Sequence, residues 1–504
     1  MGAAQPADVA AFLDDDPAGA ERADRQGRDG KVSLISRRAV LTAALAAGLT
    51  GRQALARDMA LGLAQRPPVK PVPGSASLIA RADLSGQVCY AVFDPSAGAM
   101  LEDGAGSASL APASTLKMVT ALYALDRLGP SHRFRTRILR AGDMLVLAGA
   151  GDPVLSSDDL ADLAAKLVDT GQGSPKRFAI WGGALPRIEE IAPPQADHLA
   201  YNPALSGMIL NFNRVHLGWR RGGDSYEVSL EARAARNSPR AYTITAHPAA
   251  QQDLFGYRFD DGREVWTVSR SAMGRAGSRW LPVRQPELYA GDVFQTLCRA
   301  KGLVLPAPEV IDSLPAAEEL VSHESPPLSR VVEEMLYYST NLTAEVIGLH
   351  ASGAPDLTAS AAKMREWVAA QGLSDDFSFA DHSGLSAESR VSAVAMVRLL
   401  AGPGLEAGLP DLLKHNPLAG VADDDTPHRA EVFAKTGTLN FVSNLAGYAI
   451  APSGRRLAFA TLCSDGPRHA ATRGQEMPAG VSSWTRRAKR LQHELIESWV
   501  ARFG

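Results

Sequence analysis

A serine and a lysine at positions i and i+3 are the first residues in this chain that could do chemistry together. Ser114 and Lys117 lie in the small-residue segment 112–117, directly before an apolar run. A serine hydroxyl is a weak nucleophile until a neighbouring group accepts its proton, and an amine can be that group. On a helix, residues at this spacing share a face, so the two side chains would meet. The pair therefore indicates a nucleophile and its base.

The residues after Ser114 have the period of an amphipathic helix. Apolar side chains recur at steps of three and stop at Gly129-Pro130, which predicts a helix that begins near the serine. Its first turn would offer unpaired N–H groups and the positive end of the helix dipole to a developing negative charge. Alone the pair is a weak signal, because a capped helix often carries the same residues. The periodic positions are Leu116, Val119, Leu122, Leu125 and Leu128.

Two further motifs strengthen the assignment of a serine nucleophile. Ser339-Thr340-Asn341 follows a second amphipathic run, which places it at the end of a helix or in the loop beyond. Lys435-Thr436-Gly437-Thr438 lies in an extended stretch before a β-hairpin, which we place on an edge strand. Ser-x-x-Lys, Ser-x-Asn and Lys-Thr-Gly, in this order, are the signature set of the penicillin-recognising serine enzymes.

Each residue of these motifs has a predicted task. Lys117 accepts the proton of Ser114 when its amine is neutral, and a second ammonium at Lys435 disfavours its charged form. Ser339 relays a proton to the leaving amine, and Asn341 holds the first lysine and the substrate amide. Substrate binding needs a cation and a hydroxyl for a terminal carboxylate, a glycine that permits close approach, and two oxyanion donors. We assign these tasks to Lys435 and Thr436, to Gly437, and to the amides of Ser114 and Thr438.

Composition limits the other classes of function. The 504 residues are 45% hydrophobic and 21% charged, which is typical of soluble globular domains, and two or three domains are expected. A formal net charge of −3 argues against nucleic acid or an anionic membrane as the main partner. With 3 cysteines neither a disulfide framework nor a zinc cluster is available, and we expect no metal and no cofactor. Cys89 and Cys463 fall on strands that could be neighbours, where two buried thiols are the first expectation and a disulfide the second.

The first 56 residues have the parts of an export signal. A polar lead to residue 35, rich in Ala, Asp and Gly, predicts disorder. Arg37-Arg38, a short apolar stretch and the small-residue site 54–56 follow, and the apolar stretch is too short to span a bilayer. The paired arginines favour a twin-arginine signal over an ordinary secretory one. We therefore expect a periplasmic protein whose mature chain has no transmembrane anchor.

The spacing of apolar residues predicts the order of strands and helices in the mature chain. Residues 88–93 predict a strand and hairpin that lead to the Ser114 helix, and short alternating runs predict a largely β insert. Helical patterns return around 328–336 and 360–371, and residues 445–463 predict a hairpin. The last stretch, 484–503, is expected to be a terminal helix packed on the sheet rather than a membrane-surface helix.

In these motifs the chain resembles the class C low-molecular-mass penicillin-binding proteins, which are D-alanyl-D-alanine carboxypeptidases and endopeptidases. The resemblance runs from about Ala76 to the C-terminus. The long interval between Ser114 and Ser339 is similar to the interval in which that family carries an inserted pair of domains. Other segments that carry the likeness are residues 110–115, 128–135, 151–153, 201–203, 383–386 and 435–439.

The resemblance implies an α/β (α+β) fold: a β-lactamase/transpeptidase-like domain with a mainly antiparallel five-stranded sheet flanked by helices. Residues 57–136 and 316–504 would form this domain, and residues 137–315 would form the β-rich insert as two nested subdomains. It also implies a periplasmic serine carboxypeptidase/endopeptidase that cleaves peptidoglycan stem peptides or cross-links through an acyl-Ser114 intermediate. β-Lactam antibiotics would be covalent inhibitors.

The same resemblance implies a pocket for the diaminopimelate side chain of the substrate. Its acidic and aromatic members would be Asp197 and Tyr201. An arginine that relatives often carry after Ser-Gly-Leu-Ser is Ala387 here, with Arg390 the nearest substitute. The side-chain specificity of the enzyme therefore stays open.

Other readings of the sequence remain. A β-lactamase shares all three motifs, and a non-catalytic scaffold could keep the fold. His350 and His382 could suggest a Ser-His-Asp hydrolase, but no Gly-x-Ser-x-Gly elbow occurs and both are expected to be structural. Asp152, in Gly-Asp-Pro, is expected to be a turn or cap residue. Carboxypeptidase and endopeptidase activity are not separated by the sequence.

Overall fold

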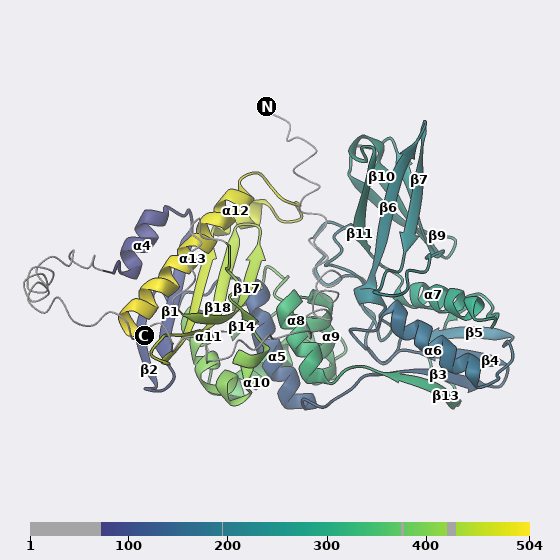
Figure 1. The fold of residues 1–504 in the computed structure, drawn as a ribbon, viewed down its shortest axis with the longest axis horizontal. Helices are drawn as coiled ribbons and strands as arrows, with labels where there is room; N and C mark the ends of the chain where they lie inside the picture. Colours follow the sequence, from purple (N-terminus) through teal and green to yellow (C-terminus); the bar gives the residue numbers. More distant parts are fainter. Residues whose placement is uncertain (1–71, 194, 374–376, 421–429) are drawn as a thin grey trace, which may run out of the picture. The chain divides into compact units, whose positions relative to one another are not determined.

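The computed structural model of the chain describes residues 72–193, 195–373, 377–420 and 430–504 (Figure 1). The predicted lead and export signal of residues 1–56 lies outside these ranges. Among the described residues, no helix has the length and apolar character needed to cross a membrane.

One antiparallel sheet is formed by two strands that precede Ser114 in the sequence and four strands near the C-terminus, one of which carries Lys435. The strand order is β16-β17-β18-β19-β1-β2. Five of these strands match the predicted five-stranded sheet, and the sixth, β16, pairs with β17 at only two positions. The strands are β1 (Gln87–Asp94), β2 (Ala99–Gly104), β16 (Lys414–His415), β17 (Glu431–Leu439), β18 (Val442–Ile450) and β19 (Arg456–Ser464).

Alternation along the strands gives this sheet two apolar faces. Cys89 and Ala91 of β1 belong to a core shared with helices α5, α8, α9, α10 and α11. Tyr90 and Val92 point the other way and pack with α4 and α13. Figure 1 shows α13 lying across the sheet. Its Trp484 and Trp499 are buried, which confirms the predicted terminal helix packed on the sheet.

The helices around this sheet begin and end where local sequence signals place them. Gly129 ends α5 and Gly353 ends α9, both with positive φ, where glycine is unstrained. Short turns of 3-10 or π-helix, η1 (Ala113–Leu116), η4 (Leu400–Gly404) and η5 (Leu409–Leu412), join some of them. The helices are α4 (Ser75–Ala82), α5 (Lys117–Leu128), α8 (Leu328–Tyr338), α9 (Asn341–Ser352), α10 (Leu357–Ala370), α11 (Ala393–Leu399), α12 (Gly466–Ala471) and α13 (Val481–Phe503).

A second sheet of five strands follows in the predicted insert. Its order is β12-β5-β4-β3-β13, with parallel pairing of β5 to both β4 and β12. Two helices share the core of these strands, within the segment that we predicted to be largely β. The elements are β3 (Arg135–Ala141), β4 (Met144–Ala148), β5 (Arg177–Trp181), β12 (Pro308–Val310), β13 (Glu318–Glu324), α6 (Ser157–Asp169) and α7 (Pro286–Ala300).

Two three-stranded sheets complete the insert. One has the order β11-β6-β7 and the other β8-β10-β9, and both contribute to the same core as α6 and α7. A two-stranded sheet of β14 (Phe377–Ser378) and β15 (Arg390–Val391) lies apart from them in the sequence. The insert elements are β6 (Arg214–Gly222), β7 (Ser225–Glu231), β8 (Ile244–Ala249), β9 (Phe255–Asp260), β10 (Arg263–Ser269), β11 (Ala276–Pro282), η2 (Asn211–Asn213) and η3 (Arg270–Ala272).

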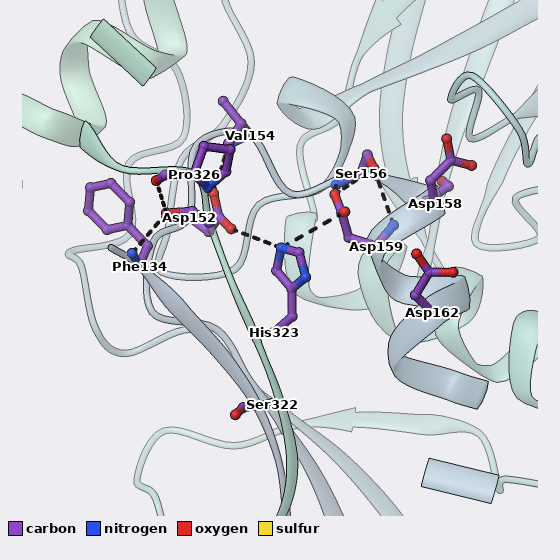
Figure 2. A network of polar contacts seen from close by, with 12 residues as sticks. Phe134, Asp152, Val154, Ser156, Asp158, Asp159, Asp162, Ser322, His323 and Pro326 are labelled. Carbon is purple, nitrogen blue, oxygen red and sulfur yellow. Dashed lines mark hydrogen bonds and ion pairs between the residues drawn. The ribbon is translucent and has the colours of Figure 1, made fainter. Parts of the chain in front are cut away.

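The chain enters and leaves the insert on neighbouring strands. β3 pairs antiparallel with β13, and just beyond them Phe134 N donates to Ser325 Oγ at 3.0 Å. Figure 2 shows His323 of β13 between two carboxylates, with its Nε2 3.8 Å from Asp152 Oδ2 and 3.9 Å from Asp159 Oδ1. The predicted bounds, 137 and 315, leave β13 outside the insert. We propose that the insert extends from Arg135 to Glu324.

All three cysteines are buried free thiols. Cys463 lies opposite Val88 in the pairing of β1 with β19, and Cys89 lies opposite Leu462. The two strands are neighbours as expected, and the first expectation, two buried thiols without a disulfide, is confirmed.

Candidate active site

The three sequence motifs meet in two hydrogen-bonded groups. Lys117 Nζ lies 2.9 Å from Ser114 Oγ and 2.7 Å from Asn341 Oδ1. Lys435 Nζ lies 2.8 Å from Ser339 Oγ. The structure therefore brings together all five residues that we predicted to be catalytic.

The segment before Ser114 is held by β18. Asn444 is buried, and its Nδ2 donates to the carbonyl oxygens of Ala111 at 2.8 Å and Pro112 at 2.9 Å. Ala113 has a φ of +47°, a left-handed conformation that is uncommon for a residue with a side chain. Ser114 follows in the turn η1, directly before α5 begins at Lys117. Ser114 therefore lies in a short helical turn, and the backbone just before it is hydrogen-bonded to β18.

A sharp break between two helices positions the middle motif. α8 ends at Tyr338, the next residue, Ser339, adopts the left-handed conformation with φ +63° and ψ +34°, and α9 begins at Asn341. A non-glycine residue in this region carries strain, and such residues cluster at functional sites. The break allows Ser339 to face Lys435 while Asn341 faces Lys117.

The third motif lies on the outer part of β17. The short strand β16 pairs only with Phe433 and Ala434, which leaves the following residues without a sheet neighbour on that side among the described strands. At Gly437 a Cβ atom would lie 2.8 Å from Pro112 O and 3.0 Å from Ser114 N. Only glycine allows this strand to run so close to the backbone at Ser114.

Burial controls the charge of both lysines. Lys117 is fully buried, and burial lowers its pKa to about 7 against the opposing influence of Asp381 and Glu345. Burial also lowers the pKa of Lys435 well below its usual range, and the charge of Lys117 adds to this. The main cause of the low Lys117 pKa is therefore burial, not the second ammonium that the sequence had suggested.

The chain that builds this site matches the D-Ala-D-Ala carboxypeptidase 3 (S13) family over residues 76–488. It is a member of the S13 family. A D-alanyl-D-alanine carboxypeptidase of Actinomadura sp. is 29% identical over 416 residues, which cover 73% of this chain and 76% of the relative. A carboxypeptidase of Mycobacterium tuberculosis is 28% identical over 412 residues, 75% of this chain and 77% of the relative.

Solved structures share the fold of this S13 family member. The crystal structure of penicillin-binding protein 4 of Haemophilus influenzae gives a TM-score of 0.66 at 18% identity, and the match covers 84% of this chain and 98% of that one. A crystal structure of the same H. influenzae protein, complexed with a β-lactam, gives a TM-score of 0.64. The likeness confirms the predicted transpeptidase-like fold.

The two predicted side-chain pocket residues lie on one loop of the insert of this S13 protein. Tyr201 is 46% exposed, and its carbonyl oxygen accepts a hydrogen bond from Asn341 Nδ2 at 3.2 Å. Asp197 is exposed, and its carbonyl oxygen accepts from Arg284 Nη2 at 2.8 Å. The loop thus reaches the catalytic motifs at Tyr201. Arg390, the nearest substitute for the arginine that relatives often carry, donates to carbonyl oxygens of its own turn, at Ala387 and Ser389.

The residues that we predicted to be structural have structural contacts. His350 and His382 have pKa values lowered by burial to about 4 and about 3, so both rings are neutral at pH 7. His382 Nε2 contacts Ser360 Oγ at 2.6 Å. Asp152 Oδ1 accepts from Val154 N at 3.0 Å, which confirms a turn role. Among the described residues, no three histidine, cysteine or acidic side chains gather as metal ligands would.

Sequence reasoning missed a turn that contacts Lys117. Ser383 O accepts a third hydrogen bond from Lys117 Nζ at 2.8 Å. The turn is held by Glu345, which is fully buried on α9. An acidic residue one helical turn after Asn341, within the apolar run of residues 342–349, is the signal that could have found it.

Proposed function

We propose that this chain is a serine-type D-Ala-D-Ala carboxypeptidase that acts on peptidoglycan stem peptides. The observation that supports this most strongly is the contact of a buried lysine amine with Ser114 Oγ, at 2.9 Å, in a chain of the S13 family. A buried amine with a pKa of about 7 is neutral often enough to act as a base. This is the property that a serine nucleophile needs.

The proposed acylation step uses both hydrogen-bonded groups. Ser114 Oγ attacks the carbonyl carbon of the penultimate D-alanine as its proton passes to Lys117 Nζ. The C–N bond then breaks, Ser339, bonded to Lys435, delivers a proton to the leaving amine of D-alanine, and the proton held by Lys117 replaces it. In deacylation Lys117 takes a proton from water, the hydroxide adds to the ester carbonyl, and the C–Oγ bond breaks. The proton on Lys117 then returns to Ser114 Oγ, so both residues end as they began.

The proposed substrate contacts lie on β17 and on the loop of the insert. Lys435 and Thr436 would bind the terminal carboxylate, and the amides of Ser114 and Thr438 would stabilise the oxyanion. The close approach of Gly437 to Ser114 N supports this pairing of amides. Asp197 and Tyr201 would contact the stem-peptide side chain, because their loop reaches Asn341 through the Tyr201 carbonyl.

Release of D-alanine from a peptide ending in D-Ala-D-Ala tests the proposed activity. The wild-type chain should release it, and Ser114→Ala should not. Turnover of nitrocefin without release of D-alanine would instead indicate a β-lactamase. If the Ser114→Ala variant gave a deletion strain the wild-type phenotype as fully as the wild-type protein does, a non-catalytic scaffold role would replace the proposal.

We further propose that the chain also cleaves cross-links, as an endopeptidase. The same acyl-serine chemistry applies to any D-alanyl amide bond, so the length of the leaving group decides between the two activities. Digestion of monomeric and cross-linked muropeptides, followed by mass spectrometry, separates them. Cross-linked dimers that stay intact while monomers lose D-alanine would refute the endopeptidase proposal.

We also propose periplasmic location through a twin-arginine signal. Its support is the Arg37-Arg38 pair with a modest apolar stretch and the small-residue site at 54–56. Replacing both arginines by lysine should keep the protein in the cytoplasm, whereas an ordinary secretory signal would tolerate the change. Cell fractionation with N-terminal sequencing of the exported protein measures both the location and the cleavage site.

A further inference from the structure

The hydrogen bonds of Lys117 fix the direction of its lone pair. Nζ has three oxygen neighbours: Ser114 Oγ at 2.9 Å, Asn341 Oδ1 at 2.7 Å and Ser383 O at 2.8 Å. An ammonium donates to all three, but a neutral amine has only two N–H bonds and one lone pair. Asn341 Oδ1 and Ser383 O are acceptors, so they take the two N–H bonds. The lone pair is left facing the Ser114 hydroxyl, which is the orientation a base requires.

The Ser383 carbonyl lies in a turn that is held from three sides. Glu345 Oε2 accepts from His382 N at 3.0 Å, and Glu345 Oε1 accepts from Ser383 N at 2.8 Å. From α5, Thr120 Oγ1 donates to His382 O at 2.6 Å. At Gly384, with φ +76°, a Cβ atom would lie only 1.9 Å from Ala113 O. The turn is therefore packed directly against the backbone that precedes the nucleophile.

Helix α9 connects both acceptors of the amine. Asn341 stands at its first turn and Glu345 one turn later on the same face. One rigid element therefore sets Asn341 Oδ1 directly and Ser383 O through the carboxylate. In Figure 1, α9 runs beside α5, the helix that begins at Lys117. The geometry of the base depends on how α5, α9 and the turn pack together.

We infer that Glu345 is a positioning residue for the base, which aims the Lys117 lone pair at Ser114 by fixing the Ser383 carbonyl. The inference deepens the proposed function and rests on it, since it assigns a device that makes the nucleophile reactive. Glu345 is expected to touch neither substrate nor nucleophile. It acts through the turn and through its charge.

Electrostatics gives the same residue a second, measurable effect. The charged groups that face Lys117 are Glu345 on α9, Asp381 in the turn and Lys435 on β17. The two acids favour the ammonium form and partly offset the burial that lowers the pKa of Lys117. Burial in turn raises the pKa of both acids above their ordinary values. Removing the carboxylate at Glu345 should therefore lower the pKa of Lys117 further.

The experiment measures the rate of acylation by a fluorescent penicillin between pH 5 and 9 for four full-length proteins. Glu345→Gln removes one acceptor and the charge. Thr120→Val removes the bond to His382 O without changing any charge. Asp292→Asn is the matched control, because Asp292 is a buried acid on α7 in the insert that likewise accepts from two consecutive amides, those of Tyr242 and Thr243. Thermal unfolding of each protein monitors the fold.

We expect three distinct results. Glu345→Gln should acylate roughly tenfold to a hundredfold more slowly at its optimum, and the acidic limb of its pH–rate profile should move to lower pH. Thr120→Val should slow acylation several-fold and leave the acidic limb of the pH–rate profile at the same pH. Asp292→Asn should melt at a lower temperature but keep the wild-type rate and limb. A merely structural Glu345 would behave like this control.

The inference is overturned if Glu345→Gln folds and keeps the wild-type rate and limb. If that variant shows no cooperative unfolding transition, Thr120→Val decides: a rate within twofold of the Asp292→Asn control overturns the inference. Both results leave the proposed function standing, because the wild type is still acylated. Failure of the wild type to be acylated would instead refute the proposed function itself.

Discussion

Two buried acids in this chain perform the same structural task in different surroundings. On α7 of the insert, Asp292 accepts from Thr243 N at 2.9 Å and from the preceding amide. On α9, Glu345 accepts from His382 N and Ser383 N. Burial raises the pKa of both acids. The difference lies in the cation nearby, which is Arg263 for the first and Lys117 for the second.

That difference separates a structural site from the proposed active site. An arginine stays charged at any pH that the protein meets, so its influence on Asp292 does not change with pH. A buried lysine with a pKa of about 7 exists in both forms near neutral pH. A carboxylate clamp near such a lysine can set both its orientation and its proton affinity. The same clamp in the insert can only hold the backbone.

The largest effect is expected at Lys117, the proposed base. Lys117→Ala removes the only side-chain nitrogen within hydrogen-bond distance of Ser114 Oγ among the described contacts. A positioned base contributes roughly 10² to 10⁴ in rate, so acylation by penicillin should fall by about that factor. Stopped-flow fluorescence measures the rate, and circular dichroism checks that the fold is retained. A fall of less than tenfold would mean that another group takes the proton.

Gly384→Ala is expected to come next. The added Cβ would meet Ala113 O at 1.9 Å, so the turn has to move away from the nucleophile. Acylation should fall more than tenfold. Gly353→Ala is the matched control, because Gly353 also has a positive φ, +61°, but open space at its Cβ. The control should lose about 1–2 kcal/mol of stability from strain alone and acylate normally. Equal acylation by both variants would show that the turn does not position the base.

The pH dependence of the wild type is a smaller but diagnostic effect. In the proposed mechanism the neutral amine of Lys117 is the base, and its pKa is about 7, so acylation should rise with pH through about 7 and then level off. Below that value the rate should fall about tenfold per pH unit, as the neutral fraction does. Single-turnover acylation across this range measures the limb. A flat profile from pH 5 to 8 would show that the lysine is not the base.

The smallest effect on acylation is expected at Asp152, which lies beside His323 of β13 in Figure 2. Burial raises the pKa of Asp152 to about 7, so the stability it contributes is full below its ordinary pKa and is lost as pH rises through about 7. Asp152→Asn abolishes this loss, so the variant should be stabilised relative to the wild type by on the order of 1 to 4 kcal/mol above pH 7. Near pH 4 the gain should vanish. Thermal unfolding at both pH values measures this, and acylation should stay within twofold.

Much of the fold and the core of the site follow from the sequence. Ser114, Lys117 and Asn341 were predictable because the chemistry demands these residue types at fixed places in short motifs. The sheet around them was predictable from apolar runs bounded by turns, such as residues 445–451 and the turn that follows them. These signals are local, so they survive without knowledge of the tertiary structure.

The rest depends on contacts between segments that are distant in sequence. Ser383 acts through its carbonyl oxygen, which every residue has, so no side chain marks it. Glu345 is visible only as an acid within an apolar helix, and its partners lie on a separate turn. Helix α7 was hidden because its apolar positions lie between strand-like runs of the insert. The reach of Tyr201 to Asn341 depends on how the insert packs.

Peptide mapping after reaction with penicillin tests the central claim most directly. The wild-type protein is incubated with benzylpenicillin at pH 7.5 and digested, and the modified residue is identified by tandem mass spectrometry. The penicilloyl group should be found on Ser114, and Lys117→Ala treated for the same short time should carry almost none. A label on any other residue, or equal labelling of both proteins, would contradict the account.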